Sequence, residues 1–246
     1  LAPYPQDAEG TLRIKSRLKP PSSDHLFGTD WVGRDVFSRV IIGTRLALQT
    51  ALVVLTIAAG IGLTLGALAG LAGGFVDNLI MRVTDIFLVI PYLVLAIAIA
   101  ALLGPGMINA FIALSLVWWP GFCRLMRGQV LSIKEDEYVV ASRSMGAPVW
   151  WIIWKHILPN TINEIMVKLS MDVGLVLLAA AALGFIGLGA EPPTPEWGSM
   201  ISESRRVYPT WWWNAVFPGA AIFVSVLAFN LFGDGIAKLS GGESRR

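Results

Sequence analysis

Long stretches without a charged residue dominate the hydrophobic pattern of this chain. Four of them cover residues 46–76, 86–123, 173–190 and 207–233. A membrane-spanning helix needs about 20 mostly apolar residues, so each stretch accommodates at least one. The second stretch is too long for one helix, and a Gly-Pro-Gly triplet at 104–106 predicts a turn within it. Its two halves then cover 86–103 and 107–123, and the pattern predicts five membrane-spanning helices.

Composition agrees with a membrane location. The chain has 246 residues, of which 55% are hydrophobic and 15% charged, whereas soluble domains have about 45–50% and about 25%. No stretch alternates polar and apolar residues as a transmembrane barrel requires. A net charge of +2 is too small to indicate a nucleic-acid partner. The expected fold class is an all-α polytopic membrane protein with lipid around it.

The distribution of basic residues predicts the orientation. The connection 124–172 contains six basic residues and the C-terminal end contains three others, so both are expected in the cytoplasm. Alternation along the chain then places 77–85 inside, and 104–106, 191–206 and 1–45 outside. The outer segment 1–45 nevertheless contains seven basic residues. We expect a further span before Leu1 to account for this conflict.

Three regions follow from these predictions: an extracytoplasmic segment 1–45, a transmembrane domain 46–240 and a cytoplasmic tail 241–246. Small residues inside the spans, including Gly60, Gly62, Gly66 and Gly70, are expected to pack the helices closely.

Residues for catalysis are missing from the sequence. The two histidines lie far apart, and the chain has no metal-ligand spacing, no phosphate-binding loop and no nucleophile motif. The spans contain almost no ionisable residue except Asp172 near one end, which argues against an ion-driven pump. We expect no catalytic residue, cofactor or metal in this chain.

The long cytoplasmic connection, placed at about 124–168, is the most informative region. Acidic residues at 135–137 favour a helix start, and Gly146 is well placed to end that helix. Pro148 fits the first turn of a second short helix that Pro159 is expected to close. Two short helices broken at a glycine predict a docking knob, and a simple interfacial connector is the alternative.

This connection resembles the EAA loop of binding-protein-dependent ABC-transporter permeases. That motif reads E-A-A, three residues, G, nine residues, I-x-L-P, and Gly146, Leu158 and Pro159 match it. The departures are Val140 in place of Glu, Ser142 in place of the second Ala, and His156 in place of Ile.

Three further segments, in order, are similar to the C-type permease of the dipeptide/oligopeptide/nickel subfamily. They begin at His25, Gly184 and Asn230, and they read HLFGTD followed by GRD, GFIGLG followed by PPTPEWG, and NLFGDG. The resemblance therefore covers nearly the whole chain.

The resemblance implies an ABC importer type I permease fold with a sixth, first span before Leu1, in the inner membrane of a prokaryote. It also implies a heterodimer with a second homologous permease, two ATPase subunits that use ATP and Mg, and an extracytoplasmic substrate-binding protein. The residues expected to form the ATPase-coupling loop are Glu137, Tyr138, Ala141, Ser142, Gly146, His156, Leu158 and Pro159.

On the outer side, Asp30, Arg34 and Asp35 are candidates for an ion-pair cluster at the pathway entrance, with a solvated structural turn as the favoured alternative. Glu196 and Trp197 lie in a proline-rich segment that is either a contact for the binding protein or a rigid turn.

The function predicted from the resemblance is the permease subunit of an ATP-driven importer, with di- or oligopeptides as the first substrate choice. Nickel or oligosaccharides are the alternative cargo. A stand-alone secondary carrier or channel is the competing class, but it requires intramembrane charges or inverted repeats, which the sequence does not show. A membrane enzyme is disfavoured by the missing catalytic residues.

Overall fold

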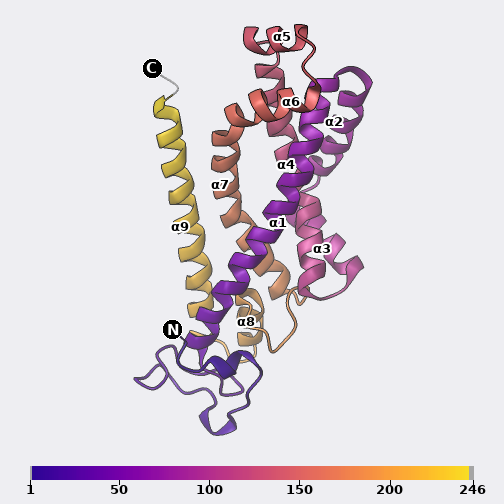
Figure 1. Cartoon of the computed structure of the whole chain (residues 1–246). Helices are drawn as coiled ribbons and strands as arrows, with labels where there is room; N and C mark the ends of the chain where they lie inside the picture. The colour runs from indigo at the N-terminus through magenta and orange to yellow at the C-terminus, as the bar shows by residue number, and fades with distance from the viewer. Residues whose placement is uncertain (1, 244–246) are drawn as a thin grey trace. The chain divides into compact units, whose positions relative to one another are not determined.

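The computed structural model describes residues 2–243, with side chains through Lys238 (Figure 1). Within these residues the chain is helical apart from turns and one isolated bridge between Thr29 and Asp35. The long and short α-helices are α1 (Val36–Ala72), α2 (Gly74–Val89), α3 (Tyr92–Leu103), α4 (Met107–Ile133), α5 (Glu137–Ser144), α6 (Val149–Ile152), α7 (Leu158–Phe185), α8 (Trp197–Ser204) and α9 (Trp213–Glu243). Two 3-10 turns, η1 (Pro5–Ala8) and η2 (Ile14–Ser16), precede them, and a π-helical turn, η3 (Ile153–Ile157), joins α6 to α7. The all-α prediction is confirmed.

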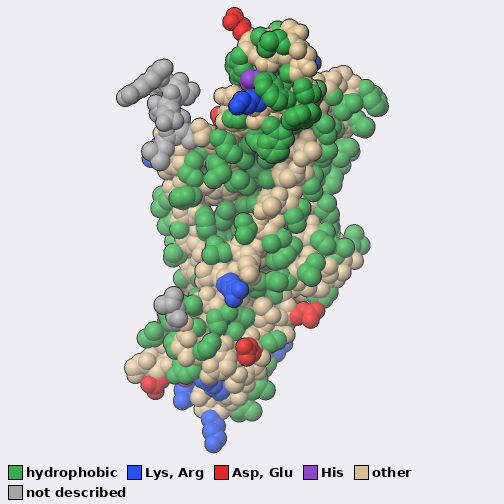
Figure 2. All heavy atoms as spheres, in the orientation of Figure 1, with side chains coloured by type: hydrophobic (Ala, Val, Ile, Leu, Met, Phe, Trp, Pro, Cys, Tyr) green, Lys and Arg blue, Asp and Glu red, His purple; other side chains and the backbone are tan. Residues whose placement is uncertain are grey.

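Four helical runs are long and apolar enough to cross a membrane. They are Val36–Ala72, Met107–Ile133, Val149–Phe185 and Trp213–Lys238. Helices α2 and α3 meet at a bend of 93° and make a fifth span if they are taken together. Many large hydrophobic side chains are exposed on the long helices, and Figure 2 shows them over the middle of the visible surface, where charged side chains are few, as expected for helices that face lipid.

The region before α4 differs from the prediction. A loop at 77–85 and one helix at 86–103 were expected, but 77–85 lies inside α2, which ends at Val89. The break comes at Ile90, whose backbone is extended, because the ring of Pro91 disfavours a helical conformation in the residue before it. The predicted Gly-Pro-Gly turn at 104–106 is confirmed, since α3 ends at Leu103 and α4 begins at Met107.

The helices α1, α4 and α9 also extend beyond the charge-free stretches that predicted them. Helix α1 begins at Val36, inside the expected outer segment 1–45, and α4 continues to Ile133, inside the expected connection 124–168. Helix α9 covers 241–243 of the expected tail, and residues 244–246 lie outside the described part of the chain. Charged residues near helix ends do not stop a helix, so an absence of charge marks only the middle of each span.

The chain divides into two compact units, and the first combines Leu1–Val53, Ala96–Leu114 and Val173–Phe229. Its core consists of Val36, Val40, Ala181, Trp197, Met200, Trp213 and Ile222. The indole N–H of Trp197 donates to the carbonyl of Val40 at 3.0 Å, so α8 is attached to the beginning of α1. Gly198 lets α8 approach α7 closely, because an added Cβ would lie 1.9 Å from the carbonyl oxygen of Ala181.

The second unit combines Val54–Leu95, Ser115–Asp172 and Asn230–Arg246. Glycines of α1 lie directly against α4 in this unit: a Cβ added at Gly62 would be 2.4 Å from the carbonyl oxygen of Trp119, and one at Gly66 would be 2.3 Å from that of Cys123. The prediction that small residues pack the helices is confirmed at these positions. Gly60 faces open space.

Candidate functional site

Helix α5 forms the first half of the predicted docking knob, and local sequence explains both its ends. Asp136 is the N-cap residue and Glu137 lies in the first turn, where negative charge favours the positive end of the helix dipole. At the other end, the N–H of Gly146 donates to the carbonyl of Arg143 at 3.0 Å, and the N–H of Ala147 donates to that of Ser142 at 3.1 Å. These two bonds define a Schellman motif. Gly146 has φ +82°, a backbone conformation that residues other than glycine and asparagine rarely adopt.

Two departures from the EAA motif, Ser142 and His156, contact each other. The Ser142 Oγ lies 3.0 Å from the His156 Nε2, and the same hydroxyl donates to the carbonyl of Tyr138 at 2.8 Å. With its proton given to Tyr138, the hydroxyl accepts from the Nε2–H tautomer of His156. The side chain of Asn160 adds a bond to the Tyr138 hydroxyl at 3.3 Å. A polar pair therefore joins α5 to η3, the turn directly before α7, at two positions where the motif has apolar side chains.

The knob has a buried base and an exposed outer face. Its base is a cluster formed by α1, α4, α5, α6 and η3, with Ala67, Met126, Val130, Ile133, Val139, Ile152 and Ile157. The outer face exposes Met145 at 81%, Trp150 at 63% and Trp154 at 67%. Glu137, Tyr138 and Ala141 are also exposed, whereas Ser142 is buried and His156 and Leu158 are half-buried. The arrangement holds the knob on unit 2 and leaves an apolar surface free for a partner.

Pro159 does not close the second helix as expected. It is the second residue of α7, and the run Val149–Phe185 continues through it. Proline lacks the N–H that a regular helix requires at an interior position. The π-helical turn η3 lies directly before it and changes the hydrogen-bond spacing there. The knob is consequently continuous with the long apolar helix α7.

Two basic residues that the orientation argument assigned to a cytoplasmic loop lie inside α4. Arg127 forms a two-pronged ion pair with Asp77 of α2, with its Nη2 2.6 Å from Oδ2. Arg124 forms a more exposed pair with Asp85, also at 2.6 Å. These pairs hold α2 on α4 within unit 2.

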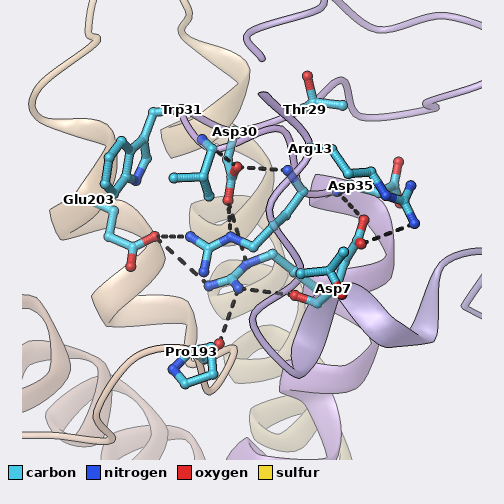
Figure 3. A network of polar contacts seen from close by, with 12 residues as sticks. Asp7, Arg13, Thr29, Asp30, Trp31, Asp35, Pro193 and Glu203 are labelled. Atoms are coloured by element: carbon cyan, nitrogen blue, oxygen red, sulfur yellow. Dashed lines mark hydrogen bonds and ion pairs between the residues drawn. The ribbon is translucent and has the colours of Figure 1, made fainter. Parts of the chain in front are cut away.

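The outer candidates Asp30, Arg34 and Asp35 are buried, with exposures of 7%, 4% and 1%, so the interpretation as a solvated turn is wrong. The Asp30 Oδ2 accepts from the Arg34 Nε at 2.6 Å, and the Arg34 Nη2 donates to the Glu203 Oε2 at 2.8 Å (Figure 3). Asp35 accepts from the backbone N–H of Ser38 at 2.8 Å, which caps the beginning of α1. Through Arg34 and Glu203, this cluster connects the N-terminal segment to α8 within unit 1.

Four further residues complete this buried network, and none of them was singled out as a site residue from the sequence. Asp7 accepts from the backbone N–H of Asp35, and the ring of His25 lies 2.8 Å from the Asp35 carboxylate. Arg39 is 1% exposed, donates to the carbonyl of Pro193 at 3.1 Å and approaches Glu203 to 3.9 Å (Figure 3). Glu203 is separated from Arg34 by 169 positions, so no local pattern could have connected them.

Glu196 and Trp197 have structural contacts within unit 1. The Glu196 carboxylate caps α8 by accepting from the backbone N–H groups of Gly198 and Ser199 at 2.8 and 2.7 Å. Burial raises the pKa of Glu196 above its ordinary value, although these two bonds oppose the shift. Trp197 is 5% exposed and belongs to the core. The rigid-turn interpretation therefore describes these two residues better than an exposed contact.

Comparisons with known proteins agree with this geometry. The sequence profile described as "Binding-protein-dependent transport system inner membrane component" matches residues 62–242. The probable D,D-dipeptide transport system permease protein DdpC of Escherichia coli K12 is 49% identical over 93% of this chain and 76% of that protein. The glutathione transport system permease protein GsiD of Pectobacterium atrosepticum is 44% identical over 94% of this chain and 77% of that protein.

A solved structure supports the fold. An inward-facing form of the MetNI methionine ABC transporter matches with a TM-score of 0.65 and 20% identity, over 81% of this chain and 95% of the matched chain. At this identity the likeness concerns the fold alone.

Proposed function

This chain belongs to the family of binding-protein-dependent transport system inner membrane components, and we propose that it imports short peptides as one of two homologous permease subunits. As a permease subunit it is a multi-pass membrane protein. In the proposed complex a substrate-binding protein delivers the peptide from outside, and two ATPase subunits bind below and use ATP and Mg. This chain forms half of the pathway and contributes no catalytic group.

The peptide assignment is supported by the relatives described above. Their names concern D,D-dipeptides and glutathione, and a third relative is the dipeptide transport system permease protein DppC of Alkalihalophilus pseudofirmus, 47% identical over 90% of this chain. All three cargoes are short peptides. We therefore place peptides before nickel or oligosaccharides as the cargo of this chain.

The observation that supports the coupling role most strongly is the construction of the knob. Its exposed face offers Glu137, Tyr138 and Ala141, which provide one charged, one aromatic and one small contact to a cleft in an ATPase. Ser142 and His156 lie behind that face and fix its geometry. We assign the exposed residues to docking and the internal pair to support.

Continuity between the knob and a spanning helix supplies the mechanical link. Residues Val149–Phe185 form one helical run that begins in the knob, and the Schellman turn at Gly146 connects α5 to that run. A push on α5 by a closing ATPase pair would move α7 as a rigid element. Such a movement would switch the pathway between outward- and inward-facing states.

Cysteine cross-linking tests the docking assignment. A cysteine at Ala141 is expected to cross-link to the ATPase subunit in the purified complex, while one at Val139, which is 2% exposed, is expected not to. Both variants are made with Cys123→Ala, since Cys123 is the native cysteine. Equal cross-linking at both positions, or none while the ATPase remains bound, would contradict the assignment. Stimulation of ATP hydrolysis by peptide-loaded binding protein tests the substrate class in the same preparation.

A further inference from the structure

A cavity of about 780 Å³ lies entirely within unit 1, between the N-terminal segment, helix α8 and the segments on either side of α8. Its lining includes Glu9, Trp31, Arg34, Glu191, Glu203 and Arg206. We propose that this cavity binds a short peptide with free amino and carboxyl ends, without help from the separate binding protein. The inference rests on the proposed peptide-importer function and adds a substrate site in this chain. Its volume is within the range of about 300–1,000 Å³ that is typical of small-ligand sites.

The charged side chains that line the cavity are of two kinds: two of them form an ion pair with each other, and three have no ion-pair partner among the described residues. Arg34 and Glu203 face each other at 2.8 Å and neutralise one another. Within the described part of the chain, Glu9, Glu191 and Arg206 have no ion-pair partner. The cavity therefore presents two carboxylates and one guanidinium to a ligand, so a ligand that carries both charges matches it best.

The two free carboxylates come from segments that touch each other. A Cβ added at Gly10 would lie 3.1 Å from the ring of Pro193, so the turn that follows Glu9 rests on the segment that follows Glu191. Carboxylates on adjoining segments create a region of negative charge at that part of the lining. A peptide ammonium group is a suitable partner for this region.

The free guanidinium is held in place by an aromatic ring. The Arg206 Cζ lies 5.4 Å from the centroid of the Trp31 ring, a cation–π arrangement that orients the side chain and leaves its donors available. The planar guanidinium fits a carboxylate with two parallel hydrogen bonds. Arg206 follows α8, whereas the two carboxylates lie on other segments. The cavity therefore has separate partners for the amino and the carboxyl end of a peptide. The indole of Trp31 adds an apolar surface for the chain between those ends.

Binding of tri-alanine to the complete transporter tests the proposal. The complex of this chain, its partner permease and the ATPases is placed in nanodiscs without binding protein, and radiolabelled tri-alanine is measured by equilibrium dialysis. Acetylation of the amino end or amidation of the carboxyl end should each weaken binding about tenfold, the effect of losing one charge-assisted hydrogen bond. Arg206→Gln should weaken binding of the free peptide similarly and abolish the discrimination against the amide.

Arg205→Gln is the matched control, because Arg205 is the adjacent exposed arginine and lies over Phe185, outside the cavity lining. It should bind tri-alanine like the unmodified protein. Binding that Arg206→Gln leaves unchanged, equal affinity for the blocked peptides, or no binding at millimolar tri-alanine would each overturn the proposal. Hydrolysis of ATP stimulated by peptide-loaded binding protein separates the two hypotheses. If peptide-loaded binding protein stimulates ATP hydrolysis but tri-alanine does not bind directly, only the proposed peptide site in the cavity is refuted. If peptide-loaded binding protein does not stimulate ATP hydrolysis, the assignment of peptides as the cargo is refuted.

Discussion

Removal of the Ser142 hydroxyl tests how the knob is held together. Ser142 is buried and its Oγ lies 3.0 Å from the His156 Nε2, so Ser142→Ala leaves a half-buried imidazole N–H without its partner. A hydrogen bond of this kind contributes about 1 kcal/mol, and an unsatisfied buried group costs about 1–3 kcal/mol. We expect Ser142→Ala to lower the opening free energy of α5 by about 1–2 kcal/mol.

Replacing both partners distinguishes a specific pair from general loss of packing. His156→Ile alone should cost about 1 kcal/mol, since the Ser142 hydroxyl loses one bond but keeps the one to the Tyr138 carbonyl. The double variant places Ala and Ile at these positions, and it should cost clearly less than the two single effects added together.

Hydrogen exchange of the α5 amides in the assembled transporter measures the opening free energies of all four proteins. Ser144→Ala serves as the control, because Ser144 is an exposed residue of the same helix and should change exchange by less than about 0.5 kcal/mol. Additive effects of the two single substitutions would refute the reasoning that Ser142 and His156 act as a pair.

Three other predictions concern the two units, and thermal unfolding in detergent measures the first two. Arg39→Met removes one member of the buried ionic network and should destabilise unit 1 by about 3–5 kcal/mol, whereas the exposed Arg45→Met should change stability by less than about 0.5 kcal/mol. Gly66→Ala forces a Cβ onto the α4 backbone and should cost about 1–3 kcal/mol, while Gly60→Ala, with open space around it, should cost nothing. Because burial raises the pKa of Glu196 above 4.5, its contribution to stability is full below pH 4.5 and is lost as the pH rises through the raised pKa. Exchange of the α8 amides, corrected for intrinsic rates, should show this loss and Glu196→Gln should remove it.

Local signals in the sequence predicted the first half of the knob but not the second, because Pro159 does not end a helix. A glycine at the end of a short helix requires no distant partner, and Gly146 ends α5 as predicted, with φ +82°. The pairing of Ser142 with His156 was not predicted, although both residues were noted as departures from the motif. Their contact depends on how α5 folds back on η3. The two residues are 14 positions apart, and that separation does not determine whether they meet.

Distant partners explain the errors elsewhere. Charges at Asp77 and Asp85 placed 77–85 in a loop, but those carboxylates pair with arginines of α4 and remain on a helix. The same applies to Asp30 and Arg34, which were expected in a solvated turn. Their burial depends on Glu203, far along the chain, and a charge is tolerated inside only where such a partner exists.

Peptide uptake per ATP hydrolysed tests the central claim most directly, namely that the knob of this permease subunit couples ATP hydrolysis to transport. The complete transporter and its binding protein are reconstituted in liposomes, and labelled tripeptide uptake is measured together with ATP hydrolysis. Gly146→Val strains the Schellman turn by about 1–2 kcal/mol, whereas Gly146→Asn tolerates its left-handed backbone, and an added Cβ has open space in either case. We predict a strongly reduced ratio of peptide to ATP for Gly146→Val and a near-normal ratio for Gly146→Asn. Equal ratios in all three proteins would contradict the account.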